Sequence, residues 1–267
     1  MLDRIGRSAI STTTDIGTLT IQLWRSLLRL PAALPIRRNR RRWRAAVQQM
    51  MAIGVSALPV VGLMSFCLGF VAALQVAAEL RRYGATHYVI EFTAIAFTRE
   101  LAALITAVAV SGRSASAIAA EVSTMVVTQE VDALRVMGLD PIEFTLAPKY
   151  LGALITVPCL TILSALFGIA AGYCFLAASI DVTVRVFVRD ALDAIMLRDV
   201  VLSLVKSLAF ATIIVHVGYM EGLRVSGGPE AVGRGTTAAV VNATFLVIVA
   251  DLAATTLFYL MGWSAAG

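Results

Sequence analysis

The chain contains a long stretch without a single charged side chain, and this stretch limits the possible folds more than any other feature. Residues 45–78 include no Asp, Glu, Lys or Arg. A helix needs about 20 apolar residues to cross the hydrocarbon core of a bilayer. Hydrophobic residues make up 59% of the chain and charged residues 15%, whereas soluble domains hold about 25% charged residues. We therefore expect a polytopic membrane protein, and the composition excludes a soluble domain, a disordered chain and a disulfide scaffold.

Apolar stretches predict five transmembrane helices, so the expected fold class is an all-α membrane protein. The predicted spans are residues 45–78, 90–112, 150–180, 200–220 and 236–262. Together they form one membrane domain, residues 45–267. Gly54 and Pro59 allow a bend or a short interfacial entry near the start of the first span. Because five is an odd number, the two ends of the domain should lie on opposite sides of the membrane.

The N-terminal segment, residues 1–44, is strongly basic and contains ten arginines. Lys and Arg concentrate on the cytoplasmic side of membrane proteins, so we expect a cytoplasmic N-terminus and a C-terminus on the outer side. Leucines at helical spacing between Leu19 and Leu30 predict a helix in the membrane interface. The alternatives are a helix packed on other protein, or a transit peptide. We expect no nucleic-acid partner, because no basic patch interleaved with aromatic residues occurs outside this segment.

Four charged residues lie well inside the predicted spans, away from the ends, where each costs several kcal/mol unless it is partnered or hydrated. They are Arg99, Glu100, Lys206 and Asp251. The depths of Lys206 and Asp251 differ by only about 6 Å at 1.5 Å per residue, so we predict that they form a structural ion pair. Arg99 lies about 15 Å into its span, and Glu100 points about 100° away from it on a regular helix. At least one of the two should meet another helix or a polar cavity, and a structural charge network and a substrate cavity are the alternatives.

The segment between the second and third spans, residues 113–149, predicts a cytoplasmic docking element. Residues 122–137 have an amphipathic pattern, and Gly138 is typical of a helix stop. The sequence Asp140-Pro141-Ile142-Glu143 is typical of a helix start. The small residues that precede this element at helical spacing allow close approach of helix backbones. The alternative is an ordinary connecting loop.

Sequence motifs for covalent chemistry are missing. The chain contains no G-x-x-x-x-G-K-[ST], no H-E-x-x-H and no G-x-S-x-G, so we expect neither ATP binding through a P-loop nor enzyme activity. Cys67, Cys159 and Cys174 lie in apolar stretches and are interpreted as small core residues. His87 and His216 are isolated in the sequence, so no metal site is expected.

Several motifs, taken together and in order, are similar to one known family. They are GFVAALQ at 69–75, ELRRYGA at 79–85, Arg99-Glu100-Leu101, SGRSASAIAAEVSTMVVTQEVDALRVMGLDP at 111–141, LAPKYLGALITVPCLT at 146–161 and SGGPEAVGRGTTAAVV at 226–241. From about residue 45 onward the chain resembles the MlaE/YrbE permease subunits of Mla- and Mce-type lipid ABC transporters. The combination is highly specific, although each motif alone would be weak.

The resemblance implies a homodimer in the bacterial inner membrane, each subunit having an N-terminal interfacial helix and five spans. It implies three further partners: cytoplasmic ABC ATPase subunits, a periplasmic MCE-domain hexamer, and a phospholipid or another hydrophobic lipid as cargo. ATP and Mg would bind to the ATPase, and no cofactor is expected in this chain. The resemblance further implies transport between the inner membrane and the periplasm or cell envelope.

The resemblance also implies roles for individual residues. A lipid cavity at the dimer interface would be lined by Ala72, Gln75, Leu80, Tyr83, Arg99 and Glu100. A coupling helix at about 124–137 would contact the ATPase through Thr128, Gln129, Glu130, Asp132 and Arg135. The family's intramembrane Lys and Asp match Lys206 and Asp251. The Pro that usually follows the Arg-Glu-Leu motif in the family is Ala103 here.

Two other functions compete with a lipid permease. The four intramembrane charges would suit a secondary transporter driven by an ion gradient, which would work without an ATPase. A structural membrane scaffold would tolerate replacement of Arg99 and Glu100 without loss of transport.

Overall fold

The described part of the chain is built from helices alone. The computed structural model describes residues 40–139, 141–180 and 182–262, and no strand occurs among them. Five helical stretches are long and apolar enough to cross a membrane: Arg44–Arg82, Thr86–Val127, Phe144–Ser179, Leu197–Leu223 and Pro229–Leu260. The expected fold class, an all-α membrane protein with five spans, is therefore confirmed. The leucine-rich helix predicted before Pro31 lies outside the described residues.

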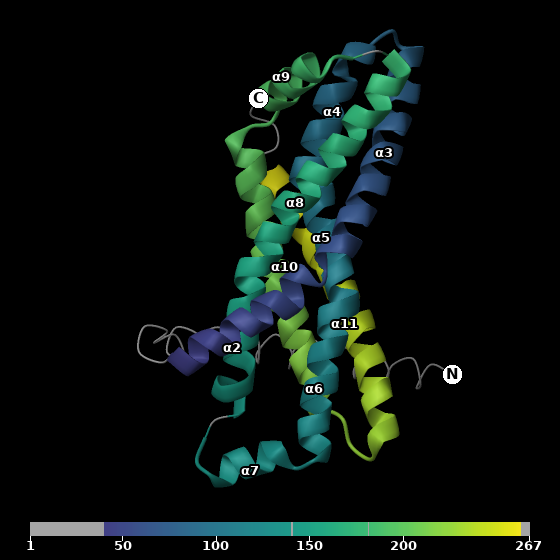
Figure 1. Cartoon of the computed structure of the whole chain (residues 1–267). Coiled ribbons are helices and arrows are strands. Elements are labelled where there is room, and N and C mark those ends of the chain that lie inside the picture. Colours follow the sequence, from purple (N-terminus) through teal and green to yellow (C-terminus); the bar gives the residue numbers. More distant parts are fainter. Residues whose placement is uncertain (1–39, 140, 181, 263–267) are drawn as a thin grey trace, which may run out of the picture.

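The first stretch is bent, as Gly54 and Pro59 suggested. Helix α2 (Arg40–Met50) passes through a π-helical turn at Met51–Val55 before α3 (Leu58–Arg82) begins. Figure 1 shows α2 lying across the bundle, whereas α3 runs along it. The crossing part of the first span therefore begins at the bend, and the residues before it lie against α8 (Ala147–Ile180).

The second helical stretch is longer than predicted. It consists of α4 (Val89–Ala96), α5 (Ala102–Val110) and α6 (Ser116–Val127), joined by π-helical turns at Phe97–Leu101 and Ser111–Ala115. The span was expected to end at residue 112, but the stretch Thr86–Val127 contains 42 residues. At 1.5 Å per residue this is about 63 Å, roughly twice the hydrocarbon thickness. The helix therefore extends well beyond one face of the membrane.

A short helix, α7 (Glu130–Val136), follows α6 and lies across the end of the bundle (Figure 1). The coupling helix was expected over 124–137, but residues 124–127 belong to α6. The break arises because Gln129 adopts a left-handed backbone, with φ at 61°. At the other end Gly138 stops α7 as predicted, with φ at 73°. The amides of Gly138 and Leu139 donate to the carbonyls of Arg135 and Leu134 at 3.0 Å, which is a Schellman motif. The predicted cap, Asp140, lies outside the described residues.

Glycines let the crossing helices approach closely. A Cβ atom on Gly69 of α3 would lie 2.3 Å from the carbonyl oxygen of Gly168 on α8. A Cβ atom on Gly168 would in turn lie 1.9 Å from Phe97. One helical turn before this contact, the hydroxyls of Ser65 and Ser164 are 2.7 Å apart. This close contact orients the π-helical turn at Phe97–Leu101 inside the bundle.

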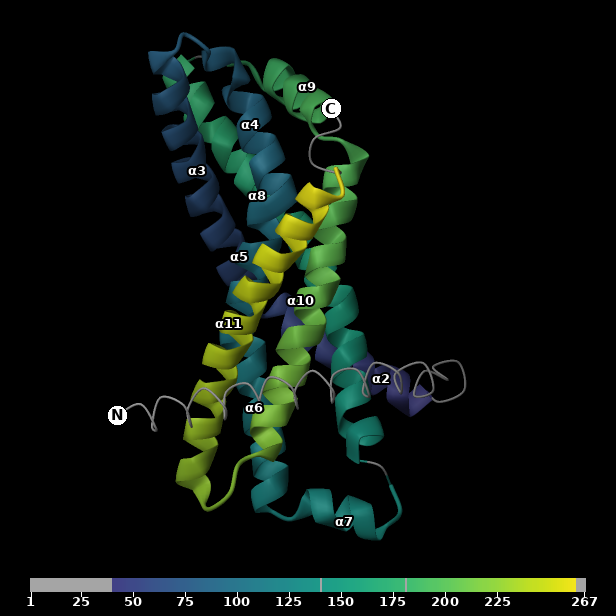
Figure 2. The same ribbon diagram turned by 180° about the vertical axis from the view of Figure 1, so that it is seen from behind.

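The last two spans are α10 (Leu197–Leu223) and α11 (Pro229–Leu260). Both run beside α6 toward the α7 end of the molecule, as Figures 1 and 2 show from opposite sides. The small residues Ser111, Ala115 and Ala119 are buried at this contact. A further helix, α9 (Val184–Ala194), lies at the opposite end and packs on α4. The bundle therefore has an α7 end and an α9 end.

Candidate functional site

The four intramembrane charges lie in one cluster in the middle of the bundle. The Lys206 ammonium donates to Asp251 Oδ1 at 3.0 Å, to Thr255 Oγ1 at 2.7 Å, and to Glu100 Oε2. An ammonium group has three N–H donors, so each of its donors has a partner. The Thr255 hydroxyl also donates to Glu100 Oε2, at 3.2 Å. The structure thus brings together Lys206 and Asp251, and it adds two members that their depths alone did not predict.

Three separate helical stretches supply this cluster. Glu100 comes from the π-helical turn in the second stretch, Lys206 from α10, and Asp251 and Thr255 from α11. Single π-helical turns inside α-helices occur frequently at functional sites. Here the turn buries Phe97 and Thr98, and it leaves the next two residues partly exposed. The side chain of Lys206 is only 1% exposed, so its charge depends on these partners.

Arg99 is the cluster's second cation, and its partner is more distant. Its Nε atom lies 4.0 Å from Glu100 Oε1, and its side chain is 20% exposed. The structure therefore agrees with the argument that neighbouring residues cannot pair closely on a helix. Because Lys206 contacts both carboxylates directly, Arg99 contributes the less compensated charge. Two cations and two anions give the cluster no net charge, which lowers the cost of its position inside a membrane.

The other residues predicted for a lipid cavity lie along α3, toward the α9 end. Ala72 is partly buried, Gln75 is exposed, and Tyr83 is 80% exposed. Leu80 packs against a buried cluster around Val89 and Leu176. Neither of two cavities found among the described residues is lined by any of these four residues or by Arg99. One cavity, of about 390 Å³, lies close by between α3 and α8, but Leu74, Ala77, Ala78 and Arg81 are its α3 residues.

The residues predicted to couple to an ATPase lie at the α7 end. The Thr128 hydroxyl donates to the Thr124 carbonyl at 2.9 Å and contacts Glu130 Oε1 at 3.1 Å. Arg135 and Asp132 form an ion pair of 3.0 Å on the outer side of α7. All five predicted residues, including Gln129, are exposed, whereas Val131 and Leu134 are buried. The polar side of α7 is therefore open to a partner.

Two polar contacts near the α7 end were not predicted. Lys149 on α8 is almost completely buried, and its ammonium lies 2.6 Å from Glu121 on α6. The buried carboxylate of Glu221 on α10 accepts from Asn242 of α11 and from Arg224, each at 3.1 Å. The chain contains only two lysines, and the presence of one of them at position 149 was a signal for the first contact. An Asn inside an apolar span was a signal for the second.

The three cysteines were expected in the core, but Cys67, Cys159 and Cys174 are free and exposed. Their helices present outer apolar faces to the membrane, so a small apolar residue is accommodated there without burial in protein. Among the described residues, no group of three or more His, Cys, Asp or Glu side chains is placed to hold a metal ion.

Comparison with known proteins agrees with this architecture. The family model described as Permease MlaE matches residues 46–257. A probable ABC transporter permease protein from Rickettsia prowazekii is 33% identical over 213 residues, covering 80% of this chain and 82% of the relative. A probable ABC transporter permease protein from Synechocystis is 34% identical, covering 78% and 79%. The chloroplastic protein TRIGALACTOSYLDIACYLGLYCEROL 1 from Arabidopsis thaliana is 31% identical, covering 89% and 69%.

Proposed function

Because this chain belongs to the MlaE permease family and is therefore the permease subunit of an ABC transporter, we propose that it moves a phospholipid or another hydrophobic lipid. Transport would run between the bacterial inner membrane and the periplasm or cell envelope. One relative supports a lipid cargo, since its name contains that of a lipid, trigalactosyldiacylglycerol. The energy would come from a separate ATPase that binds ATP and Mg.

The observation that carries this proposal is the position of Arg99. Its guanidinium is partly exposed inside the bundle, and its carboxylate neighbour is engaged by Lys206. A guanidinium binds phosphate through two parallel hydrogen bonds. A lipid headgroup at the level of Arg99 would place its acyl chains along the apolar surfaces of the neighbouring spans. The arrangement suits an anionic amphiphile better than a small soluble ion.

The lipid cavity is proposed to be completed by a second copy of the chain. Broad apolar surfaces remain exposed on the outer sides of α3 and α11, including Leu63, Phe66, Phe245 and Leu252. Gln75 lies on the exposed side of α3, where its amide would face hydrocarbon if the subunit were alone. A homodimer that encloses Ala72, Gln75, Leu80, Tyr83, Arg99 and Glu100 would give this amide a polar environment.

The remaining partners are proposed from the two ends of the bundle. The exposed polar side of α7 supports docking of the cytoplasmic ATPase there, which puts the α7 end in the cytoplasm together with the basic segment before α2. The α9 end then faces the periplasm, where the MCE-domain hexamer would dock. ATP-driven movement of the ATPase would act on the spans through α7 and the long helix that carries it.

The test is lipid crosslinking in the assembled transporter. The subunit and its ATPase are reconstituted in vesicles of phosphatidylethanolamine and phosphatidylglycerol that contain a photoactivatable phosphatidylglycerol. We expect Arg99→Ala to reduce crosslinking to the second and fifth spans about tenfold, which corresponds to the loss of one charged hydrogen bond. Arg113→Ala is the matched control, because Arg113 is exposed on the same helical stretch. Undiminished crosslinking in Arg99→Ala would remove this residue from the cargo site.

A second comparison separates the ATP-driven function from the ion-driven one. The charge cluster would also suit a proton relay, since it contains two carboxylates and a lysine in contact. Lipid transfer in the same vesicles is measured with ATP alone and with a proton gradient alone. We expect transfer with ATP only, and Glu130→Lys should abolish it by weakening ATPase binding while membrane insertion is unchanged. Transfer driven by the gradient without ATP would contradict the proposal.

A further inference from the structure

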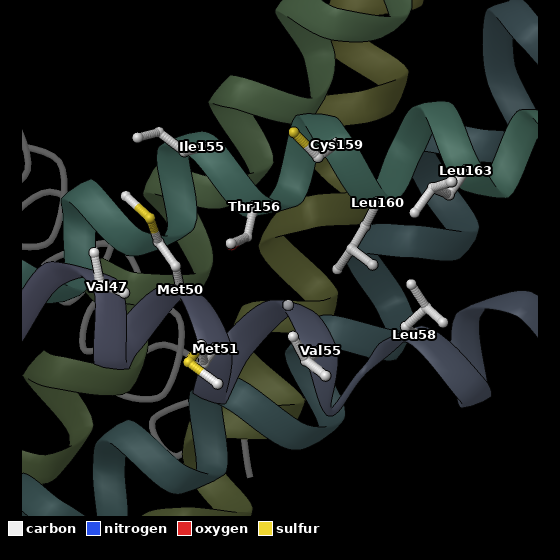
Figure 3. Close-up of a pocket in the computed structure, with 11 residues that line it drawn as sticks. Val47, Met50, Met51, Val55, Leu58, Ile155, Thr156, Cys159, Leu160 and Leu163 are labelled. Atoms are coloured by element: carbon white, nitrogen blue, oxygen red, sulfur yellow. The ribbon is translucent and has the colours of Figure 1, made fainter.

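A groove opens where the bent first stretch meets α8, and no residue of the charge cluster lines it. We call it the α2–α8 groove. Val47, Met51 and Val55 line it from the bent stretch, and Ile155, Cys159 and Leu163 line it from α8. Figure 3 shows Met50 reaching from α2 toward α8, with Thr156 and Leu160 pointing back toward α2. Its cavity volume is about 310 Å³, at the lower end of the range for small-ligand sites.

The lining of the groove offers almost no hydrogen bonding to a ligand. Thr156 is its only hydroxyl among the lining residues, and that hydroxyl donates to the Gly152 carbonyl at 2.7 Å. Gly54 keeps the two walls close, because a Cβ atom there would lie 3.0 Å from the Thr156 methyl group. Met51 and Val55 are more than half exposed, so the groove is open toward the surrounding lipid. An apolar ligand is therefore favoured.

A cation lies on the same face of α2 as two residues of this apolar groove. Arg44 is exposed on α2 and precedes Val47 by three residues and Met51 by seven, the spacing of one helix face. Along the helix axis, Arg44 and Val47 are about 4.5 Å apart. Arg40, Arg41 and Arg42 precede it in the sequence. A basic end followed by an apolar groove matches the shape of an anionic lipid, with its phosphate at Arg44 and one acyl chain beyond it.

We propose that the α2–α8 groove binds a membrane phospholipid of the leaflet on the α7 side, with its phosphate at Arg44 and one acyl chain between α2 and α8. This lipid is a resident ligand and not the transported cargo, because none of the residues proposed for the cargo cavity lines the groove. It holds α2 against α8 at the bend. The inference does not depend on which molecule the transporter carries.

The chemistry of the groove argues against a transmembrane helix of another protein as its occupant. An acyl chain is thinner and flexible, and the methionines at the mouth adapt to it. Arg44 adds a preference for negative charge that an apolar helix does not satisfy.

The test uses the full-length protein in nanodiscs of phosphatidylcholine containing a small fraction of photoactivatable phosphatidylglycerol, with the reactive group on the acyl chain. Crosslinked peptides are identified by mass spectrometry. We expect labelling on both walls of the groove, at residues 47–58 and 155–163. Val55→Trp should reduce it several-fold by filling the groove. Leu166→Trp is the matched control, because Leu166 and Val55 are 60% and 65% exposed but only Val55 lines the groove.

Headgroup recognition is tested separately. Arg44→Gln should lower labelling by phosphatidylglycerol about tenfold, and it should leave labelling by a photoactivatable diacylglycerol, which has no phosphate, unchanged. Arg234→Gln serves as the control, since Arg234 is an exposed arginine near the start of α11, at the α7 end. If Val55→Trp impairs folding, the groove can be filled after folding. For this, Cys159 is converted to a mixed disulfide with a dodecyl thiosulfonate, which releases a sulfinate, in a variant whose Cys67 and Cys174 are serine.

Three results would overturn the proposal. Equal labelling in Val55→Trp and Leu166→Trp would show only general contact with bulk lipid. Crosslinking of Cys159 to a second polypeptide in native membranes, with no lipid labelling of the groove in nanodiscs, would assign the groove to a protein partner. Absence of groove labelling in the unmodified protein, together with normal ATP-driven lipid transfer, would disprove this inference alone and leave the proposed function intact.

Discussion

At the scale of single residues, Lys206 is the group on which the charge cluster depends. Lys206→Met would leave two carboxylates opposite Arg99 alone, whereas Asp251→Asn would leave Lys206 with Glu100 and Thr255. We expect Lys206→Met to cost about 3–5 kcal/mol of stability, the range for an uncompensated buried charge, and Asp251→Asn to cost less. The double variant returns the cluster to zero net charge, so its loss should be smaller than the sum. Thermal unfolding in detergent, followed by size-exclusion chromatography, measures the coupling; additive losses would contradict it.

The sequence predicted part of this cluster and missed the rest for a geometric reason. Their similar depths in the membrane were enough to pair Lys206 with Asp251, because residues of neighbouring antiparallel helices meet at similar depths. Glu100 was placed by assuming a regular helix of 100° per residue, whereas it lies in a π-helical turn that changes the direction of its side chain. Such a turn has no reliable sequence signature, so the third partner of Lys206 had to be found in the structure.

The contact between α6 and α8 gives a second prediction at this scale, because its two charges differ in exposure. Lys149 is 2% exposed and Glu121 is 52% exposed. Glu121→Gln would strand a buried ammonium, whereas Lys149→Met would leave a carboxylate that water can solvate. We therefore expect Glu121→Gln to lower the unfolding temperature more than Lys149→Met. Glu79→Gln, which removes the exposed pair with Arg82 at 3.6 Å, is the control and should change stability by less than about 1 kcal/mol. Equal effects of the first two variants would refute the asymmetry.

At the scale of helices, hydropathy predicted which segments cross the membrane but not where each helix ends. Arg113 was interpreted as the end of the second span. The helix continues to Val127 because residues 114–127 contain no Gly or Pro and are rich in residues that tolerate a helix. Leaving the bilayer and ending a helix are separate events, since water replaces lipid around a helix whose backbone hydrogen bonds are already formed.

The packing of α3 on α8 gives a prediction for helices. A methyl group on Gly69 would meet the backbone of Gly168 at 2.3 Å, and backbone cannot rotate away. We expect Gly69→Ala to destabilise the protein by about 1–3 kcal/mol and to loosen the contact that orients Phe97. Gly62→Ala, two turns earlier on the same helix, meets only the Phe167 ring at 3.4 Å. That variant should be neutral or slightly stabilising, because Ala favours a helix over Gly by about 1 kcal/mol. Unfolding temperatures of the two variants provide the comparison, and a stable Gly69→Ala would disprove the tight contact.

At the scale of the whole molecule, the described residues do not close the proposed cargo cavity by themselves. Its charge cluster is closed by three of its own helical stretches, but the residues of the proposed cargo cavity on α3 remain on an outer surface. The family resemblance implied a cavity at these residues, and in the proposed dimer its missing wall would come from a second copy of the chain. That proposal would also explain why so much apolar surface of α3 and α11 is exposed in the single chain.

The dimer can be tested at Gln75, which lies about 10 Å from the end of α3 on its exposed side. In a background with Cys67, Cys159 and Cys174 replaced by serine, Gln75→Cys should form a disulfide-linked dimer when membranes are oxidised. Leu166→Cys is the control: Leu166 is 60% exposed on α8, a span outside the proposed interface on α3 and α11. We expect the Leu166→Cys variant to remain monomeric on non-reducing gels.

Crosslinking of the α8 position alone would place the second subunit on the opposite side, and Gln75 would then face lipid. Crosslinking at both positions would indicate random collision, whereas crosslinking at Gln75 alone places its amide at the interface, where the cargo cavity would be closed.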